Sequence, residues 1–249
     1  MISLIPLEGI PEVVPGDDLA ALIAAALTAG GIGLDIDDVL VVTQKVVSKA
    51  EGRVVELASV TPREEARAWG ERWGKDPRQV ELVLQESVDV LRWADRGLII
   101  SRTRHGFVCA NAGVDLSNVG GGEVATLLPD DPDASARALR AGLRGLTGVA
   151  PAVVISDSFG RPWRKGIVNI AIGCAGMEPL VDLRGTPDVQ GRVMHSTVIA
   201  VADELASAAD LAGGKVAQRP VVLVRGWQHG AGEGAASALV MDRALDLFP

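Results

Sequence analysis

An α+β fold, with mixed and largely antiparallel sheets and packed helices, is predicted by three features of the sequence. Three short runs of mainly β-branched residues are typical of strands buried on both faces: 39–43, 152–156 and 221–224. Longer stretches with the apolar spacing of helices lie between these runs. Strands and helices do not alternate with the regularity of βαβ units, which argues against a Rossmann sheet.

The first helix and the first buried strand are marked by clear boundary residues. Asp17 and Asp18 are placed to cap a helix that runs to about Ala29, where two glycines end it. The strand 39–43 follows. The stretch 44–49 is polar at the strand exit, and we expect it to leave the sheet as a loop.

The middle of the chain predicts a second helical region and a hairpin. Residues 61–64 combine a cap, a proline in the first turn and an acidic residue, which together favour a helix start. This helical region breaks near 74–77 and is expected to continue through 80–93. Two apolar runs, 98–101 and 106–109, flank a polar turn and predict a β-hairpin.

The second half of the chain repeats these elements. An amphipathic helix is expected over 134–143, before the second buried strand at 152–156. The alanine-rich stretch 193–211 is expected to be mostly helical. The third buried strand, 221–224, ends at an arginine and a glycine.

The composition limits the classes of protein to which the chain can belong. Hydrophobic residues make up 48% of its 249 residues, but only 3% are aromatic and tyrosine is absent, so Ala, Val, Leu and Ile form the core. The formal net charge is −8, and no basic run is longer than a pair. Nucleic-acid binding requires clustered Lys and Arg, so we expect no nucleic-acid partner.

Three further features predict a cytoplasmic protein that does not enter a membrane. Cys109 and Cys174 lie in apolar surroundings without metal-ligand spacing, and we interpret them as buried free thiols in a reducing compartment. The N-terminus lacks the basic start and apolar core of a signal peptide. The longest apolar stretch, 19–27, is too short to span a bilayer.

Polar loops follow the predicted strands and carry candidate metal ligands. Asp157 and Ser158 come directly after the strand 152–156, and Asp115 lies among small residues. Hard divalent cations prefer carboxylate oxygens, so these residues could hold a pair of metal ions that bridge phosphates. The alternative is that each residue only caps a turn or a helix, as Asp and Ser often do.

Charged residues in the loops and the absence of standard motifs limit the reactions that the chain could catalyse. Arg161, Arg164 and Lys165 could steady a polyanionic substrate, although a solvated surface loop is the alternative for each charge. The stretch 213–216 is not a Walker loop, and 230–234 matches a dinucleotide fingerprint only weakly. No Ser-His-Asp order or nucleophile elbow is present, so we do not expect a catalytic nucleophile.

Five segments, taken together, resemble the coenzyme F420-0:L-glutamate ligase family, whose members are gamma-glutamyl ligases. The segments occur in the family's order across nearly the whole chain, and their combination is specific although no single segment is. They are Ile10–Val13, Val42–Arg53, Ala112–Val119, Ser156–Arg164 and Val201–Asp210.

The resemblance implies an enzyme that ligates L-glutamate to the deazaflavin F420-0 through an acyl phosphate formed from GTP. It allows further γ-linked addition of glutamate. The implied cofactors are GTP, Mg2+ or Mn2+, and K+. The implied assembly is an intertwined homodimer of one ligase unit, 1–249, with a larger and a smaller subdomain and no fused C-terminal reductase domain.

The family's functional positions fall on particular residues of this chain. The metal-ligand positions correspond to Asp115, Asp157 and Ser158, and the two aspartates together with Lys49 are the implied catalytic residues. The positions that contact the nucleotide correspond to Ile10, Pro11, Glu12, Val13, Gln44, Lys49, Asn118, Gly213, Gly214, Lys215 and Val216.

Two of these positions depart from the family's pattern. Gln44 stands where a serine is usual, and Lys215 where some members have a neutral metal ligand. An ammonium group cannot coordinate a metal, so either one metal ion is bound less fully or Lys215 contacts a phosphate. The alternatives to this ligase are a nucleotide-dependent amide ligase or kinase for another carboxylate, a nicotinamide or deazaflavin oxidoreductase, and a non-catalytic protein that binds GTP.

Overall fold

The computed structural model describes residues 1–116, 123–230 and 232–246. The described α-helices are α1 (Leu19–Ala29), α2 (Gln44–Ala50), α3 (Glu64–Trp73), α4 (Pro77–Gln85), α5 (Pro132–Thr147) and α6 (Val201–Gly213). Among the described residues, no helix combines the length and the apolar character that a bilayer crossing requires. The described strands are β1 (Ser3–Pro6), β2 (Val39–Thr43), β3 (Val54–Glu56), β4 (Ser87–Ala94), β5 (Leu98–Thr103), β6 (Val108–Ala110), β7 (Val124–Thr126), β8 (Ala152–Arg161), β9 (Arg164–Ala175), β10 (Val181–Asp182), β11 (Val198–Ile199) and β12 (Val221–Arg225).

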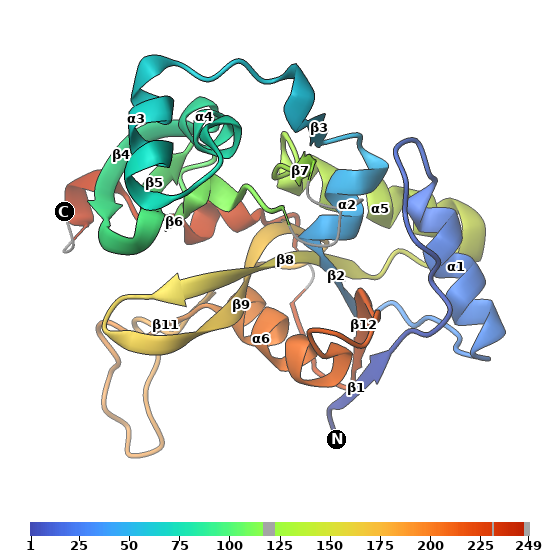
Figure 1. The fold of residues 1–249 in the computed structure, drawn as a ribbon. Helices are drawn as coiled ribbons and strands as arrows, with labels where there is room; N and C mark the ends of the chain where they lie inside the picture. The colour runs from blue at the N-terminus through green and yellow to red at the C-terminus, as the bar shows by residue number, and fades with distance from the viewer. Residues whose placement is uncertain (117–122, 231, 247–249) are drawn as a thin grey trace.

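A five-stranded sheet in the order β1-β12-β2-β8-β9 lies at the centre of the molecule (Figure 1). Its neighbouring strands are antiparallel except for β2 and β8, which run parallel. The first four residues of β2 and of β12 are all buried. The predicted α+β fold with largely antiparallel sheets is confirmed.

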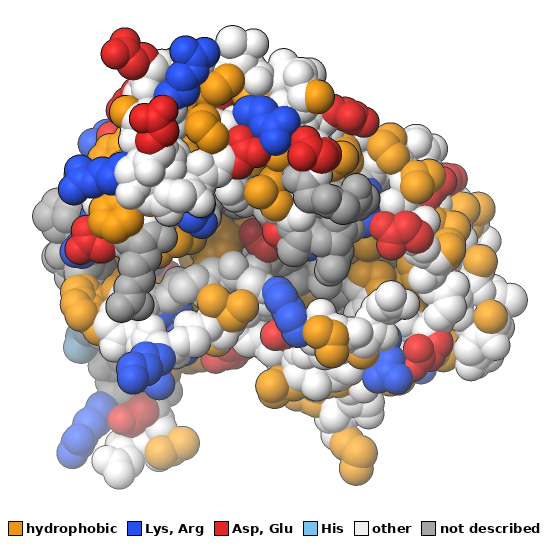
Figure 2. All heavy atoms as spheres, in the orientation of Figure 1, with side chains coloured by type: hydrophobic (Ala, Val, Ile, Leu, Met, Phe, Trp, Pro, Cys, Tyr) orange, Lys and Arg blue, Asp and Glu red, His pale blue; other side chains and the backbone are white. Residues whose placement is uncertain are grey.

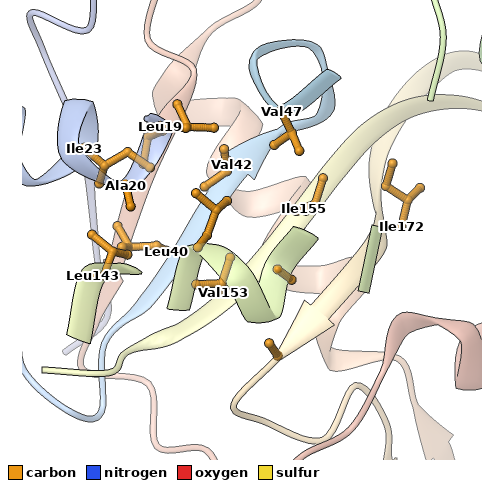
Figure 3. Packing of buried hydrophobic residues seen from close by; sticks show 14 of the residues in the cluster. Leu19, Ala20, Ile23, Leu40, Val42, Val47, Leu143, Val153, Ile155 and Ile172 are labelled. Carbon is orange, nitrogen blue, oxygen red and sulfur yellow. The ribbon is translucent and has the colours of Figure 1, made fainter. Parts of the chain in front are cut away.

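Two apolar clusters pack against opposite faces of this sheet, since successive strand residues point to opposite sides. On one face, Leu40 and Val42 of β2 pack with Ile23 of α1 and Leu143 of α5 (Figure 3). On the other face, Val39 belongs to a cluster that includes the buried apolar residues of α6. The sheet is therefore packed between helices, and the loops at its strand ends extend from this packed core.

A smaller three-stranded sheet, β4-β5-β6, packs with α3 and α4 around a third apolar cluster. The Trp69 ring of α3 is partly buried and packs against this cluster, with its centroid 4.4 Å from that of Trp93 and 5.7 Å from that of Trp73. Figure 1 shows this layer beside the central sheet, while the long β8–β9 hairpin extends away from the helices that cover that sheet.

Several predicted elements lie where the sequence places them. The first helix ends at Ala29, and at its start the Asp18 side chain accepts a hydrogen bond from the N–H of Ala21. The buried runs form β2, β8 and β12, the amphipathic stretch forms α5, and β5 and β6 form the expected hairpin. Cys109 and Cys174 are buried free thiols, as predicted.

Two predictions in the first half of the chain are wrong. Residues 44–49 do not form a loop but belong to α2, because the stretch contains no helix breaker and turns Val47 into the core. The helix expected over 80–93 ends at Gln85. The rest of that stretch forms β4, because its backbone pairs with β5, a partner that local apolar spacing does not reveal.

Two more predictions fail in the second half for the same reason. The polar loop predicted to follow the strand 152–156 does not form, since the β8–β9 pairing continues to Arg161 opposite Arg164. The helix expected over 193–211 begins only at Val201, because Val198 pairs with Asp182 in the β10–β11 ladder. In each case, strand pairing satisfies the backbone irrespective of side-chain polarity.

Candidate active site

Several segments singled out from the sequence leave the same edge of the five-stranded sheet. Thr43 pairs with Ser156 in the parallel β2–β8 ladder, so Gln44 and Asp157 follow at the same level. Because β12 runs opposite to β2 and β1 opposite to β12, β1 ends and β12 begins at this edge. The N–H of Thr43 donates to the carbonyl oxygen of Pro220 at 2.8 Å, which joins the segment before β12 to it.

Two aspartates come together at this edge. Asp157 continues β8 and is half-buried. Asp115 lies on another segment, where it exchanges backbone hydrogen bonds of 3.0 and 2.9 Å with Thr126. Its Oδ2 lies 2.7 Å from Nζ of Lys45, the second residue of α2. This ion pair brings Asp115 against the edge that carries Asp157.

The surroundings of Asp157 disfavour its negative charge. Burial, and to a smaller extent the charge of Asp115, raise the pKa of Asp157 to about 6. The N–H of Ser158 donates to its Oδ1 at 2.8 Å and opposes this shift, as do the positive charges of Lys215 and Lys45. A carboxylate in such a place is stabilised strongly by a bound cation.

The oxygen atoms of this site fit a hard divalent cation such as Mg2+ or Mn2+. In the part of the chain that the structure describes, no three His, Cys, Asp or Glu side chains gather as a metal-binding group. Asp115 and Asp157 would therefore hold the ion with help from other oxygens. Mg2+ is commonly bound in this way, by one or two carboxylates, substrate phosphates and water.

Ser158, the third predicted metal ligand, is hydrogen-bonded within the protein. Its Oγ donates to Oδ1 of Asn169 at 2.6 Å, across the β8–β9 ladder. The Nζ of Lys215 donates to the same Oγ at 2.5 Å. Asn169 is not predicted from the sequence, although a single amide within the apolar run 167–172 was a signal for it.

The segment after β1 meets α2 through an ion pair. The Nζ of buried Lys49 lies 2.5 Å from Oε1 of Glu12, whose side chain is 76% exposed. Ile10 and Val13 pack on the apolar cluster that contains Leu40 and Val42, which fixes this segment. Pro11 is exposed. Two residues expected to contact the nucleotide thus contact one another.

Gln44 is buried at the start of α2, with its side-chain amide turned inward. Its Nε2 donates to Oγ of Ser48 at 2.6 Å and to the carbonyl oxygen of Leu127 at 3.1 Å. The amide nitrogen therefore ties α2 to the neighbouring segment. Asn118, also expected at the nucleotide, lies outside the described residues.

A small cavity of about 30 Å³ lies between β2, β8 and the segment that leads into β12. Asn169, Asp210 and the predicted nucleotide-contact residues Gly213 and Gly214 line it. Ser156 lines it too, and its buried Oγ has no hydrogen-bond partner among the described residues. The cavity has room for water molecules rather than for a nucleoside.

The molecule is also hollowed on the face shown in Figure 2, between the layer of α3, α4 and β4–β6 and the β8–β9 hairpin. A larger cavity of about 420 Å³ is lined in part by Asp130, Asp131 and Asp133, and the predicted site residues within the described ranges are not among its lining. There Asp131 caps α5, and Asp133 accepts hydrogen bonds from the N–H groups of Cys174 and Ala236. These carboxylates hold the fold together.

The basic cluster lies at the tip of the β8–β9 hairpin. Arg164 and Lys165 are exposed, and Nη2 of Arg161 donates to the carbonyl oxygen of Lys165 at 3.1 Å. Arg161 lies four residues further along the strand than Asp157, a span of about 13 Å. The cluster therefore lies away from the two aspartates, at the far end of the hairpin.

The glycine-rich stretch 230–234 has a packing explanation. A Cβ added at Gly232 would lie 2.5 Å from Oε1 of Glu178, and one at Gly234 would lie 2.5 Å from Cδ of Pro179. Within the described residues 235–246, no α-helix follows the stretch. The helix that a dinucleotide-binding turn requires is therefore missing from this part of the structure.

Known proteins resemble the chain over all the segments that form this edge. Residues 9–226 match the family model described as F420-0:Gamma-glutamyl ligase. A coenzyme F420:L-glutamate ligase of Methanothermobacter thermautotrophicus is 47% identical over 250 residues, covering 99% of this chain and 98% of the relative. Proteins of the same name from Methanopyrus kandleri and Archaeoglobus fulgidus are 44% and 40% identical, each covering 99% of this chain and 96% of the relative.

Proposed function

The chain belongs to the F420-0:gamma-glutamyl ligase family, and from this premise we propose that it joins L-glutamate to the deazaflavin F420-0 with conversion of GTP to GDP and phosphate. The family makes the chain a ligase that forms a carbon–nitrogen bond. We propose in addition which nucleotide and which metal ions are used, and in what order the chemical steps occur.

The proposed reaction begins with activation of a carboxylate, because amide formation from a free carboxylate is unfavourable in water. A carboxylate oxygen of F420-0 attacks the γ-phosphorus of GTP, the bond to the β,γ-bridging oxygen breaks, and GDP leaves. The α-amine of L-glutamate then attacks the acyl carbon, loses a proton and expels phosphate. A second cycle on the γ-carboxylate of the added glutamate would extend the product by one γ-linked residue.

The arrangement of charge at the sheet edge carries this proposal. Phosphoryl transfer depends mainly on positioning and on neutralising charge. Asp115 and Asp157 would hold Mg2+ or Mn2+, which supplies positive charge to the phosphates when bound, and K+ would assist. The ammonium of Lys49, anchored by Glu12 at 2.5 Å, would bind a phosphate oxygen. The segments 10–13 and 213–216 flank this position and would hold the nucleotide.

The direct test is the product formed from F420-0. The purified protein is incubated with F420-0, L-glutamate, GTP and Mn2+, and the products are analysed by mass spectrometry. We expect a mass gain of one or more glutamyl residues that requires both GTP and the metal. If GTP binds but F420-0 is recovered unchanged, the acceptor is wrong, and a related ligase or kinase for another carboxylate takes its place.

The acyl phosphate has its own test. F420-0 labelled with ¹⁸O in the reacting carboxylate should transfer one labelled oxygen to the released phosphate, because that oxygen becomes the bridge of the acyl phosphate. Unlabelled phosphate with normal amide formation would rule out this intermediate while leaving the ligase activity intact.

A further inference from the structure

Lys215 reaches the predicted metal site from a segment anchored at both ends. α6 ends at Gly213, and Gly214 turns the chain with a φ of +71°. At the other end, the carbonyl oxygen of Pro220 accepts the N–H of Thr43 at 2.8 Å. Between these anchors the side chain of Lys215 extends over the edge, so that its Nζ lies 2.5 Å from Oγ of Ser158.

The hydroxyl of Ser158 is engaged on both sides. Its proton is directed to Oδ1 of Asn169 at 2.6 Å, and one lone pair accepts the Lys215 ammonium. Asn169 is fixed in turn, because its backbone carbonyl oxygen accepts the Ser207 hydroxyl at 2.7 Å. The ammonium therefore sits where a metal ion bound to Ser158 would have to approach.

The positive charge of Lys215 disfavours a metal ion at Ser158. A divalent ion on Ser158 Oγ would lie about 2 Å from that oxygen and would be close to the ammonium. Two cations at such a separation repel each other, whereas an ion held by Asp115 and Asp157 needs no contact with Ser158.

We propose that Lys215 is a tethered cation that takes the place of a second metal ion at Ser158. The site then holds one divalent ion, through Asp115 and Asp157, and the Lys215 ammonium supplies the second positive charge to the phosphates. Ser158 positions that ammonium instead of coordinating metal. The inference rests on the proposed metal- and GTP-dependent function and specifies its metal content.

The test is the number of Mn2+ ions bound per chain in the presence of the β,γ-imido analogue of GTP. Calorimetry gives the stoichiometry, and electron paramagnetic resonance detects a coupled pair of Mn2+ ions. Wild type is expected to bind one ion without a pair signal. Lys215→Gln, which removes the charge and adds a neutral oxygen ligand, is expected to bind two and to show the pair signal.

Three further variants separate the causes. Lys215→Met removes the charge without adding a ligand, and we expect it to admit the second ion more weakly than Lys215→Gln. Adding Ser158→Ala to Lys215→Gln should return the count to one. Lys75→Gln, at the α3–α4 turn, changes the net charge equally and should leave the count at one. Since Lys215 is exposed, its replacement leaves the core intact.

The results of these experiments distinguish the role of Lys215 from the proposed ligase function. Two ions in wild type, or one ion in both Lys215 variants, would overturn the tethered cation and leave the ligase proposal standing. No Mn2+ bound to wild type, together with no glutamyl product, would overturn the metal-dependent function and the inference with it.

Discussion

Thr43 of β2 and Ser156 of β8 are parallel partners, and this pairing places the start of α2 beside Asp157. The other neighbouring strands in the described sheet are antiparallel. The parallel pair brings two strand ends to one edge, and the antiparallel β12 adds the segment that carries Lys215. Residues more than 100 positions apart in the sequence thereby share one site.

Replacing Asp157 with Asn should abolish ligation without unfolding the protein. The amide cannot supply the charge that holds the divalent ion, so we expect turnover to fall at least about 100-fold. Burial already disfavours the charged carboxylate, so the melting temperature should not fall. Asp37→Asn, an exposed change before β2, is the control and should keep normal turnover. Near-normal activity of Asp157→Asn with saturating Mn2+ would remove Asp157 from the metal site.

Replacing Lys49 with Ala should weaken nucleotide use more than stability. The change removes the proposed phosphate contact, and we expect KM for GTP to rise about 10-fold or more, a loss of about 1.4 kcal/mol or more in binding. Glu12→Gln retains the lysine but loosens its anchor, so its KM should rise less. The prediction fails if both variants keep the KM of wild type while Lys49→Ala only unfolds more easily.

The Arg63–Glu81 ion pair should make stability depend on pH in the acid range. Nη2 of Arg63 lies 2.7 Å from Oε1 of Glu81, whose side chain is 4% exposed. Hydrogen bonds from Arg63 lower the pKa of Glu81 to about 2. Because this pKa is lowered, the ion pair contributes its full stability at pH values above the ordinary pKa of 4.5. That contribution is lost as the pH falls from 4.5 through about 2.

Urea unfolding of Glu81→Gln checks this dependence. At pH 7 we expect a loss of about 2–3 kcal/mol in the free energy of unfolding, because a buried partner of Arg63 is removed. The difference from wild type should shrink as the pH falls below 4.5. Glu65→Gln, on the exposed side of α3, should match wild type throughout. A difference that stays constant down to pH 3 would contradict the assigned pKa.

Replacing Gly173 with Ala should destabilise the contact between β9 and α5. A Cβ at this position would lie 2.3 Å from the carbonyl oxygen of Pro132, so one of the two elements has to move. We expect a loss of about 1–3 kcal/mol, measured by thermal or urea unfolding. Gly160→Ala on the adjacent strand is the matched control, since no atom lies within 4 Å of its added Cβ. Equal stability of the two variants would argue against the close packing of β9 on α5.

Local sequence patterns predicted the structure correctly where the apolar pattern is a direct result of burial. The runs that became β2, β8 and β12 are apolar on both faces, because both faces of the sheet are covered, and this is visible in the residues alone. The cap at Asp18 and the glycines after Ala29 likewise act within one helical turn.

The signals failed where a strand is defined by its partner. Neither β4 nor the outer part of the β8–β9 hairpin has an apolar run of its own, and each is a strand because another segment supplies its hydrogen bonds. Lys215 shows the same limit at the site. Its sequence context suggested a departure from a family pattern, but its contact with Ser158 depends on the course of a loop.

The sequence by itself determined the fold class, the buried strands and the family, because composition, apolar periodicity and shared motifs are properties of the linear chain. The tertiary structure alone decided which polar residues meet: Asp115 with Lys45, Glu12 with Lys49, and Ser158 with Asn169 and Lys215. Such contacts follow from strand order and register, which are set by pairing between distant segments, so no short window of the sequence contains them.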